Sequence, residues 1–288
     1  MLNNRDDATD IVHELKRIAD ALAPAAAHDV FENHRAFRVL IRKGSPSIHG
    51  IRQPDPVCFE ELCGIAPFIE KLCTNTEQFL QNLPCNNVLL YGSRGTGKSS
   101  SVKALLNKYG GQGLRIVEMP HETLLFLSDI SDIIRLRPER FILFCDDLAY
   151  DDRDGTYRQL KAMLEGGLES KPDNILIYAT SNRRHLMPEK IGDNLPRLEN
   201  GELHPSDTLE EKMSLSDRFG LRLGLSTFDS DIYLEIVRNY VALNNLSIDE
   251  SLLELEALRW PLAHGSYSGR TARQFVDDLR GRMQLQGL

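Results

Sequence analysis

Eight consecutive residues carry the clearest chemistry in this chain. Residues 92–99 are Gly-Ser-Arg-Gly-Thr-Gly-Lys-Ser, which fits the spacing G-x-x-x-x-G-K-[ST]. Glycines let such a loop turn tightly, so that its backbone N–H groups converge on one anion. The lysine then reaches the β- and γ-phosphates and the final hydroxyl reaches Mg²⁺. The pattern therefore predicts a nucleoside triphosphate site with Lys98 on the phosphates and Ser99 on the metal.

The residues on either side support this interpretation. An apolar run at 87–91 predicts a strand before the loop, and Val102, Leu105 and Leu106 predict a helix that begins at about Lys98. The helix dipole would add to the anion site. The alternative is a glycine-rich surface turn, and four fixed positions match by chance in about one chain of this length in a hundred. The expected phosphate contacts are Gly92, Ser93, Arg94, Gly95, Thr96, Gly97, Lys98, Ser99 and Ser100.

A second group of polar residues follows two buried strands. The apolar run 141–145 ends in Asp146 and Asp147, and the apolar run 175–180 is followed by Asn182. A strand-end aspartate beside a phosphate loop holds Mg²⁺, and a second carboxylate can orient the attacking water. Asp146 and Asp147 fit these two roles, and Asn182 could bind the water or the γ-phosphate. The alternatives are a solvated acidic turn and an ordinary turn asparagine.

The order of expected elements predicts the fold class. Strands and helices alternate through the middle of the chain, which indicates an α/β fold with a parallel five-stranded sheet between helices. After about residue 228 the pattern is helical only. Helices are also expected at 9–23 and 59–82, with a loop-rich linker at 28–57. Expected strands are 87–91, 114–119, 141–145, 175–180 and 221–226; expected helices are 121–136, 154–168, 232–243, 248–260 and 270–283.

These elements suggest three regions. Residues 1–50 would be a helical or linker region available for partner binding, residues 51–228 the α/β core, and residues 229–288 a small helical lid. Five cysteines without C-x-x-C spacing disfavour zinc ligation and a disulfide framework, and favour reduced thiols in the cytoplasm. No signal-peptide core or membrane-spanning run is expected.

Six runs, taken together and in order, resemble AAA+ ATPases over roughly residues 55–285. They are Leu-Cys-Gly-Ile at 62–65, the loop at 92–99, Asp-Asp at 146–147, Ala-Thr-Ser-Asn at 179–182, Ser-Asp-Arg-Phe-Gly at 216–220, and Ser-Gly-Arg-Thr-Ala-Arg at 268–273. The runs around 86–100, 140–152 and 174–186 look more closely like a bacterial AAA+ family described only as a domain of unknown function. The nearest described branch is the initiator and helicase-loader type.

The resemblance implies roles for further residues. Arg218 would be the arginine finger that acts on a neighbour's ATP, and Asn182 would be sensor 1. Arg273 would be sensor 2, with Arg270 as the alternative. Gly64 and Ile65 would lie against the adenine. A finger supplied from a neighbour implies a homo-oligomer, often a hexamer or an open spiral, with ATP and Mg²⁺ bound at the subunit interface.

Two departures from the AAA+ pattern affect the expected activity. Many members have glutamate where this chain has Asp147, which is one methylene shorter. Residues 119–138 lack the aromatic–apolar–glycine pore loop of protein-threading members. The first interpretation is an ATP-hydrolysing motor or remodeller, and the alternative is a nucleotide-gated switch or adaptor with slow hydrolysis. A GTPase is disfavoured because residues 107–110 are not N-K-x-D and lie at the end of the first helix after the loop, where no guanine reader belongs. A small-molecule kinase is disfavoured because kinases generally lack signals such as those at Arg218 and Arg273.

The client is not identified by the sequence. The formal net charge of −8 disfavours broad nucleic-acid binding, although basic groups gather locally at 183–185 and at Arg35, Arg38, Arg42 and Lys43. Solvated basic side chains on an acidic protein are the favoured interpretation of both groups. A protein or a nucleic acid both remain candidate clients.

Overall fold

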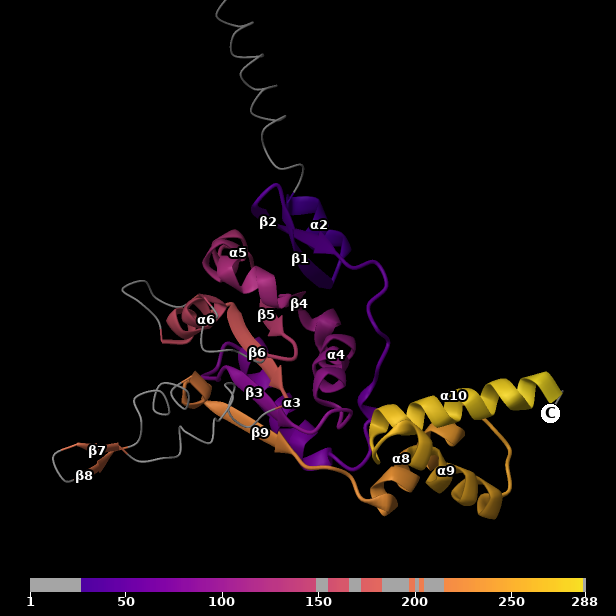
Figure 1. Ribbon diagram of the computed structural model, residues 1–288. Helices are drawn as coiled ribbons and strands as arrows, with labels where there is room; N and C mark the ends of the chain where they lie inside the picture. The colour runs from indigo at the N-terminus through magenta and orange to yellow at the C-terminus, as the bar shows by residue number, and fades with distance from the viewer. Residues whose placement is uncertain are drawn as a thin grey trace, which may run out of the picture.

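A seven-stranded sheet covered by helices forms the body of the protein (Figure 1). The computed structural model describes residues 27–148, 155–165, 172–182, 197–199, 202–204 and 215–286. All neighbouring strands pair in parallel except the first two, which are antiparallel. The strand order is β2 (Ser45–Gly50), β1 (Ala36–Arg42), β4 (Leu114–Glu118), β5 (Arg140–Cys145), β6 (Ile175–Ser181), β3 (Val88–Gly92) and β9 (Leu221–Leu225).

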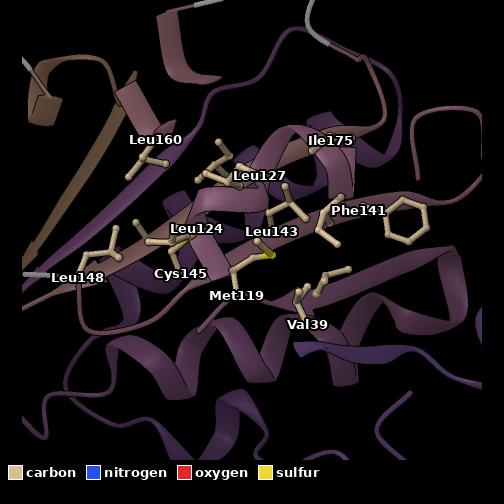
Figure 2. Packing of buried hydrophobic residues seen from close by; sticks show 14 of the residues in the cluster. Val39, Met119, Leu124, Leu127, Phe141, Leu143, Cys145, Leu148, Leu160 and Ile175 are labelled. Carbon is tan, nitrogen blue, oxygen red and sulfur yellow. The ribbon is translucent and has the colours of Figure 1, made fainter. Parts of the chain in front are cut away.

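The central strands are apolar along their length because helices cover both faces of the sheet. On one face, α2 (Ala27–Asn33), α5 (Leu127–Ile134) and α6 (Gly155–Glu165) contribute to a core that Figure 2 shows around Leu143 and Leu127. On the other face, α3 (Ala66–Leu80) and α4 (Lys98–Tyr109) pack against β3 and β6. Three 3₁₀ segments complete this part: η1 (Phe59–Glu61), η2 (Gly110–Gln112) and η3 (His121–Phe126).

The predictions of a five-stranded sheet and of a linker at 28–57 are wrong. Residues 36–50 form a hairpin that extends the sheet, with Phe37 and Val39 fully buried. The tight turn at Lys43 and Gly44 has φ values of 51° and 80°, as two-residue hairpin turns require. Pro46 is tolerated because β2 is an edge strand. Glycine and proline therefore mark a hairpin turn and a sheet edge, where we expected a linker.

The α/β class and the helical lid are confirmed. Helices α8 (Ser230–Leu243), α9 (Glu250–His264) and α10 (Gly269–Gln286) enclose a core of their own around Tyr233 and Phe275. Asp229 caps α8 by accepting hydrogen bonds from the N–H groups of Asp231 and Ile232. A short hairpin, β7 (Arg197–Glu199) and β8 (Glu202–His204), was not expected. The helix predicted at 9–23 lies outside the described residues.

Gly92 fixes the junction between β3 and the phosphate loop. Its φ is 131°, and a Cβ at this position would lie 1.9 Å from the carbonyl oxygen of Leu225 on β9. We expect Gly92→Ala to lower the free energy of unfolding by about 3 kcal/mol, because strain and a backbone clash act together. Urea denaturation followed by circular dichroism measures this. Gly111→Ala, which meets no atom within 4 Å, is the matched control and should change stability little.

Candidate nucleotide site

A cavity of about 510 Å³ lies between the carboxyl ends of β3, β5 and β6 and the lid helices α8 and α10. The carboxyl ends of parallel strands are where open α/β sheets bind ligands. The wall includes most of the predicted site residues. It is lined by Glu61, Leu62, Cys63, Ile65, Arg94, Gly95, Thr96, Gly97, Lys98, Ser99, Ser100, Lys103, Asp146, Asp147, Thr180, Asn182, Phe228, Ile236, Tyr240, Gly269, Arg270 and Arg273.

The loop that follows β3 has the expected shape. Gly97 is the N-cap of α4 with φ 98°, and the helix begins at Lys98 as the sequence predicts. Within the loop, Thr96 Oγ1 donates to the Ser93 carbonyl at 2.8 Å. The Gly269 N–H donates to the Gly95 carbonyl at 2.9 Å, so the first residue of α10 is tied to the loop. The lid therefore contacts the phosphate-binding segment directly.

Lys98 is held at the bottom of this loop. Its ammonium donates to the carbonyls of Gly92 and Ser93 at 2.8 and 2.6 Å and to Asn182 Oδ1 at 3.2 Å. Burial lowers the pKa of Lys98, and the nearby Asp147 and Asp146 carboxylates oppose that shift. Gly92 and Ser93, which were predicted to contact phosphate, thus lie outside the cavity lining and bind Lys98 through their carbonyls. To reach a phosphate, the ammonium must exchange at least one of these bonds.

The predicted metal ligands meet at one point on the wall. Ser99 Oγ donates to Asp146 Oδ1 at 2.6 Å. A hydroxyl and a carboxylate are the hard oxygen donors that Mg²⁺ prefers, and Mg²⁺ usually keeps several waters beside one or two protein ligands. The donor set therefore fits Mg²⁺, with Ser99 and Asp146 as the residues that would hold it.

Asp147 and Asn182 form the adjoining part of the wall. Asn182 Nδ2 donates to Asp147 Oδ1, while Asn182 Oδ1 accepts from Lys98. Asp147 itself has a left-handed backbone with φ 52°, which is uncommon for residues other than glycine and is found often at functional sites. Asn182 therefore links Lys98, the predicted phosphate-binding lysine, to the carboxylate predicted to orient water.

Thr180 is a site residue that the sequence analysis missed. Its hydroxyl donates to Asp146 Oδ1 at 2.5 Å and accepts from the Asp147 N–H at 2.8 Å. The register pairs Cys145 with Ala179, which places Thr180 beside Asp146 at the ends of adjacent strands. Its place near the end of a buried strand, two residues before Asn182, was the only sign in the sequence. One side chain thus bonds to the Asp146 carboxylate and to the backbone of Asp147.

For the ATP hydrolysis that the motifs predict, Thr180→Val should lower the rate constant about 10- to 100-fold, because a hydrogen bond to a charged group contributes about 1.5–3 kcal/mol. The affinity for ATP should change far less, since valine keeps the shape of the side chain. Steady-state hydrolysis and equilibrium ATP binding measure the two effects. Thr76→Val removes a buried hydroxyl that bonds to Tyr178 elsewhere in the fold, and should affect stability without this loss of rate.

Part of the cavity lining is apolar and suits a base. Ile65 belongs to it, as do Phe228, Ile236 and Tyr240 from the lid side, which the sequence analysis did not identify. Gly64, which was predicted to lie against the adenine, is not among the lining residues. It has φ 77° and lies against Ile232, so that the 62–65 segment packs on α8. Burial raises the pKa of Tyr240, and Glu61 adds to that shift while Arg273 opposes it.

The three predicted arginines occupy different places. Arg270 lies beside the phosphate loop, since a Cβ built on Gly95 would be 3.4 Å from Arg270 Cβ, and Arg273 lies near Tyr240. Both line the cavity. Arg218 does not. Its guanidinium donates to Glu165 at the end of α6, with an Nε–Oε1 distance of 2.7 Å and a second, shorter bond from Nη2. The chain therefore does not bring Arg218 to its own site.

A family model described as "Protein of unknown function (DUF815)" matches residues 32–283. The chain belongs to the DUF815 family. No curated protein matches it in a sequence search. The match begins before β1 and ends within α10, so the hairpin, the sheet, the cavity and the lid are all parts of the DUF815 unit.

Solved structures show that this DUF815 chain has the AAA+ fold. The RuvB Holliday junction branch migration motor of Thermotoga maritima aligns with a TM-score of 0.55 and 18% identity, covering 81% of this chain and 67% of RuvB. Domain III of the Thermotoga maritima replication initiation protein DnaA aligns with a TM-score of 0.51 and 17% identity, covering 82% of this chain and 91% of that one. The resemblance to AAA+ proteins near the initiator branch is thereby confirmed at the level of fold. Among the described helices, none is long and apolar enough to cross a membrane.

Proposed function

We propose that this DUF815 chain binds Mg-ATP and hydrolyses it at an interface between subunits, to drive remodelling or loading of a client. One observation carries the proposal. A continuous series of hydrogen bonds joins Ser99, Asp146, Thr180, Asp147, Asn182 and Lys98 along one wall of the cavity. A phosphate-binding lysine, a metal-binding pair and a water-orienting carboxylate are the parts that phosphoanhydride hydrolysis requires.

The side chains would act in the following way. Lys98 exchanges a carbonyl partner for the β- and γ-phosphates, and the backbone N–H groups of the loop bind the same oxygens. Asp147 accepts a hydrogen bond from the attacking water and thereby orients it, and Asn182 keeps that carboxylate beside the γ-phosphate position. Mg²⁺ held by Ser99 and Asp146 would neutralise charge on the phosphate oxygens. Arg270 adds positive charge beside the loop from the lid.

Adenine fits the base position better than guanine, which would need a protein segment that recognises it. The part of the lining proposed for the base is apolar. At the end of α4, where residues 107–110 lie, Asn107 Nδ2 already donates to the carbonyls of Asp55 and Val57. We expect ATP to bind more tightly than GTP. Competition of the two nucleotides for a fluorescent ATP analogue measures this, and equal affinities would contradict it.

The assembly supplies what one subunit lacks. Arg218 lies outside the cavity of its own chain, so its proposed role as a finger requires a neighbouring copy. A head-to-tail interface that closes gives a ring, and one that does not close gives a spiral. The ATPase rate per subunit should therefore rise with protein concentration, and a rate that is independent of concentration down to the monomer would contradict the interfacial site.

A nucleotide-gated switch with slow hydrolysis is the second candidate. One contact favours it: Arg218 is paired with Glu165 within its own subunit. This contact must change before the finger reaches a neighbour. ATP-dependent assembly without turnover, measured by light scattering and phosphate release together, would favour the switch.

The client is proposed as either a protein or a nucleic acid, in the cytoplasm. Residues 1–50 stay a proposed partner-binding region, although residues 36–50 also complete the sheet. All five cysteines are free thiols, as expected of a reducing compartment. Of the local basic groups, Arg38 pairs with Glu118 at 2.7 Å, and residues 183–185 lie outside the described chain.

A further inference from the structure

Three arginines and one glutamate gather at the end of the sheet opposite the nucleotide cavity. Arg35 immediately precedes β1, Arg115 is the second residue of β4, and Arg137 and Glu139 lie within the three residues before β5. These strands are parallel, so the cluster lies at their amino ends while Asp146 follows the carboxyl end of β5. A six-residue strand places about 20 Å between its two ends. The cluster is therefore separate from the site already described.

The sheet register brings two of the arginines side by side. Ala36 is paired with Ile116, and the Ile116 N–H donates to the Arg35 carbonyl, so Arg35 and Arg115 occupy neighbouring positions. Both guanidinium groups approach Gly110: Arg115 Nη1 donates to its carbonyl at 3.2 Å, and Arg35 Cδ would lie 3.1 Å from a Cβ built there. Like charges directly opposite on adjacent strands are unfavourable.

The carboxylate in this cluster is already used. Glu139 accepts two hydrogen bonds from Arg137, at 3.1 and 3.0 Å, and both side chains are only 15% exposed. Burial would raise the pKa of Glu139, but its hydrogen bonds and the charges of Arg137 and Arg115 lower it overall. Arg137 Cζ also lies 4.3 Å from the centroid of the Phe31 ring, and this stacking fixes the plane of the guanidinium group. The hydrogen bonds of Glu139 are thus directed to Arg137, and one carboxylate faces three guanidinium groups, which leaves the cluster with a net positive charge.

Arg115 carries a donor without an acceptor. Its Nη1 bonds only to the carbonyls of Gly110 and Leu114, and its buried Nε has no hydrogen-bond partner within the described structure. Ion pairs for Arg115 or Arg35 are likewise absent from the described residues. Burial lowers the pKa of Arg115; Glu139 opposes this, and Arg35 and Arg137 lower it further. A buried donor left unpaired is costly, and an anion would satisfy it.

We propose that Arg35 and Arg115, with Arg137 held in place by Glu139, form a binding site for a phosphate group at the amino ends of β1, β4 and β5. Guanidinium groups match the oxygens of phosphate with forked, charge-assisted hydrogen bonds. The ligand binds the exposed Arg35 and draws the Arg115 side chain toward it, which gives the buried Nε an acceptor and separates the adjacent charges of the two arginines. The phosphate belongs either to a small phosphate compound or to a nucleic-acid backbone, which share this chemistry.

The test observes Arg115 directly. The full chain labelled with ¹⁵N-arginine gives Nε–H resonances, and Arg115→Lys, which keeps the charge, identifies the Arg115 signal by its disappearance. Titration with inorganic phosphate, at an ionic strength matched with chloride, should move that signal downfield in a saturable way. A single-stranded oligothymidylate at low salt is titrated in parallel. A shift by DNA at lower concentration indicates the nucleic-acid source, and a shift by inorganic phosphate alone indicates the small-molecule source.

Matched variants make the outcome decisive. Arg35→Gln changes an exposed side chain and should weaken the binding that shifts Arg115 about 10-fold, as expected for losing one charge-assisted hydrogen bond. Arg42→Gln removes an equally exposed charge at the other end of β1 and should leave the midpoint unchanged. No shift with either probe, or an unchanged midpoint in Arg35→Gln, would overturn the proposal. Because the signal comes from Arg115, phosphate bound at the Lys98 loop does not confuse the result.

Discussion

Asp147→Asn is expected to lower the ATPase rate constant by about 100-fold or more, because a positioned general base contributes about 10²–10⁴-fold. Asparagine keeps the size of the side chain and its contact with Asn182, so ATP binding should stay close to that of the unchanged protein. Phosphate release and equilibrium ATP binding, measured on the same preparation, separate the two effects. The left-handed backbone at Asp147 is also tolerated well by asparagine, which protects the fold.

Asp129→Asn is the matched control for this change, because Asp129 is an exposed carboxylate on α5, away from the cavity lining. It should leave hydrolysis unaffected. If Asp147→Asn hydrolysed ATP at the rate of the control, Asp147 would not orient the attacking water, and Asp146 would have to be reconsidered for both roles.

Arg218→Ala is expected to produce the largest loss, about 10³-fold in the rate constant, which is the lower end of what arginine fingers contribute. The cavity of the same subunit should keep its affinity for ATP because Arg218 does not line it. Arg222→Ala is the matched control: Arg222 is a nearby arginine on β9, paired with Asp217 as Arg218 is paired with Glu165. Hydrolysis and sedimentation velocity should be measured together, so that loss of assembly is distinguished from loss of catalysis.

Glu165→Gln tests the pairing of Arg218 within the subunit. If the Glu165 contact competes with insertion of the finger into a neighbour, weakening it should leave the rate unchanged or raise it. A loss as large as that of Arg218→Ala would mean that Glu165 presents the arginine to the neighbour, which would contradict the competition.

Local sequence patterns predicted the elements that are defined by residues close together in the sequence. The loop at 92–99 is defined by its own glycines, and the buried strands β5 and β6 are continuous apolar runs, so their positions were predictable. The lid helices were recognised by their periodicity and differ from the structure only at their ends. The hairpin of β1 and β2 was not recognised, because Gly44 and Pro46 are also typical of linkers. The pairing of β1 with β4, a contact between segments distant in sequence, joins this hairpin to the sheet.

The site shows the same division between local and distant information. Lys98, Ser99 and Asp146 follow from motifs, and the structure brings them together. Thr180 was missed because its role depends on the register of β5 against β6, which the sequence does not state. The placement of Gly64 against Ile232 and the pairing of Arg218 with Glu165 also depend on contacts between distant segments. Neither could be read from a linear pattern.

The most direct test of the interfacial site mixes two inactive proteins. Arg218→Ala subunits keep Asp147, and Asp147→Asn subunits keep Arg218, so a mixed interface can hold one complete site. In a random equal mixture of head-to-tail assemblies, about a quarter of the interfaces are complete. The ATPase rate of the mixture should therefore rise far above that of either protein, to about a quarter of the unchanged rate. A mixture no more active than the mean of its two components, although the subunits co-assemble, would contradict hydrolysis completed by a neighbour.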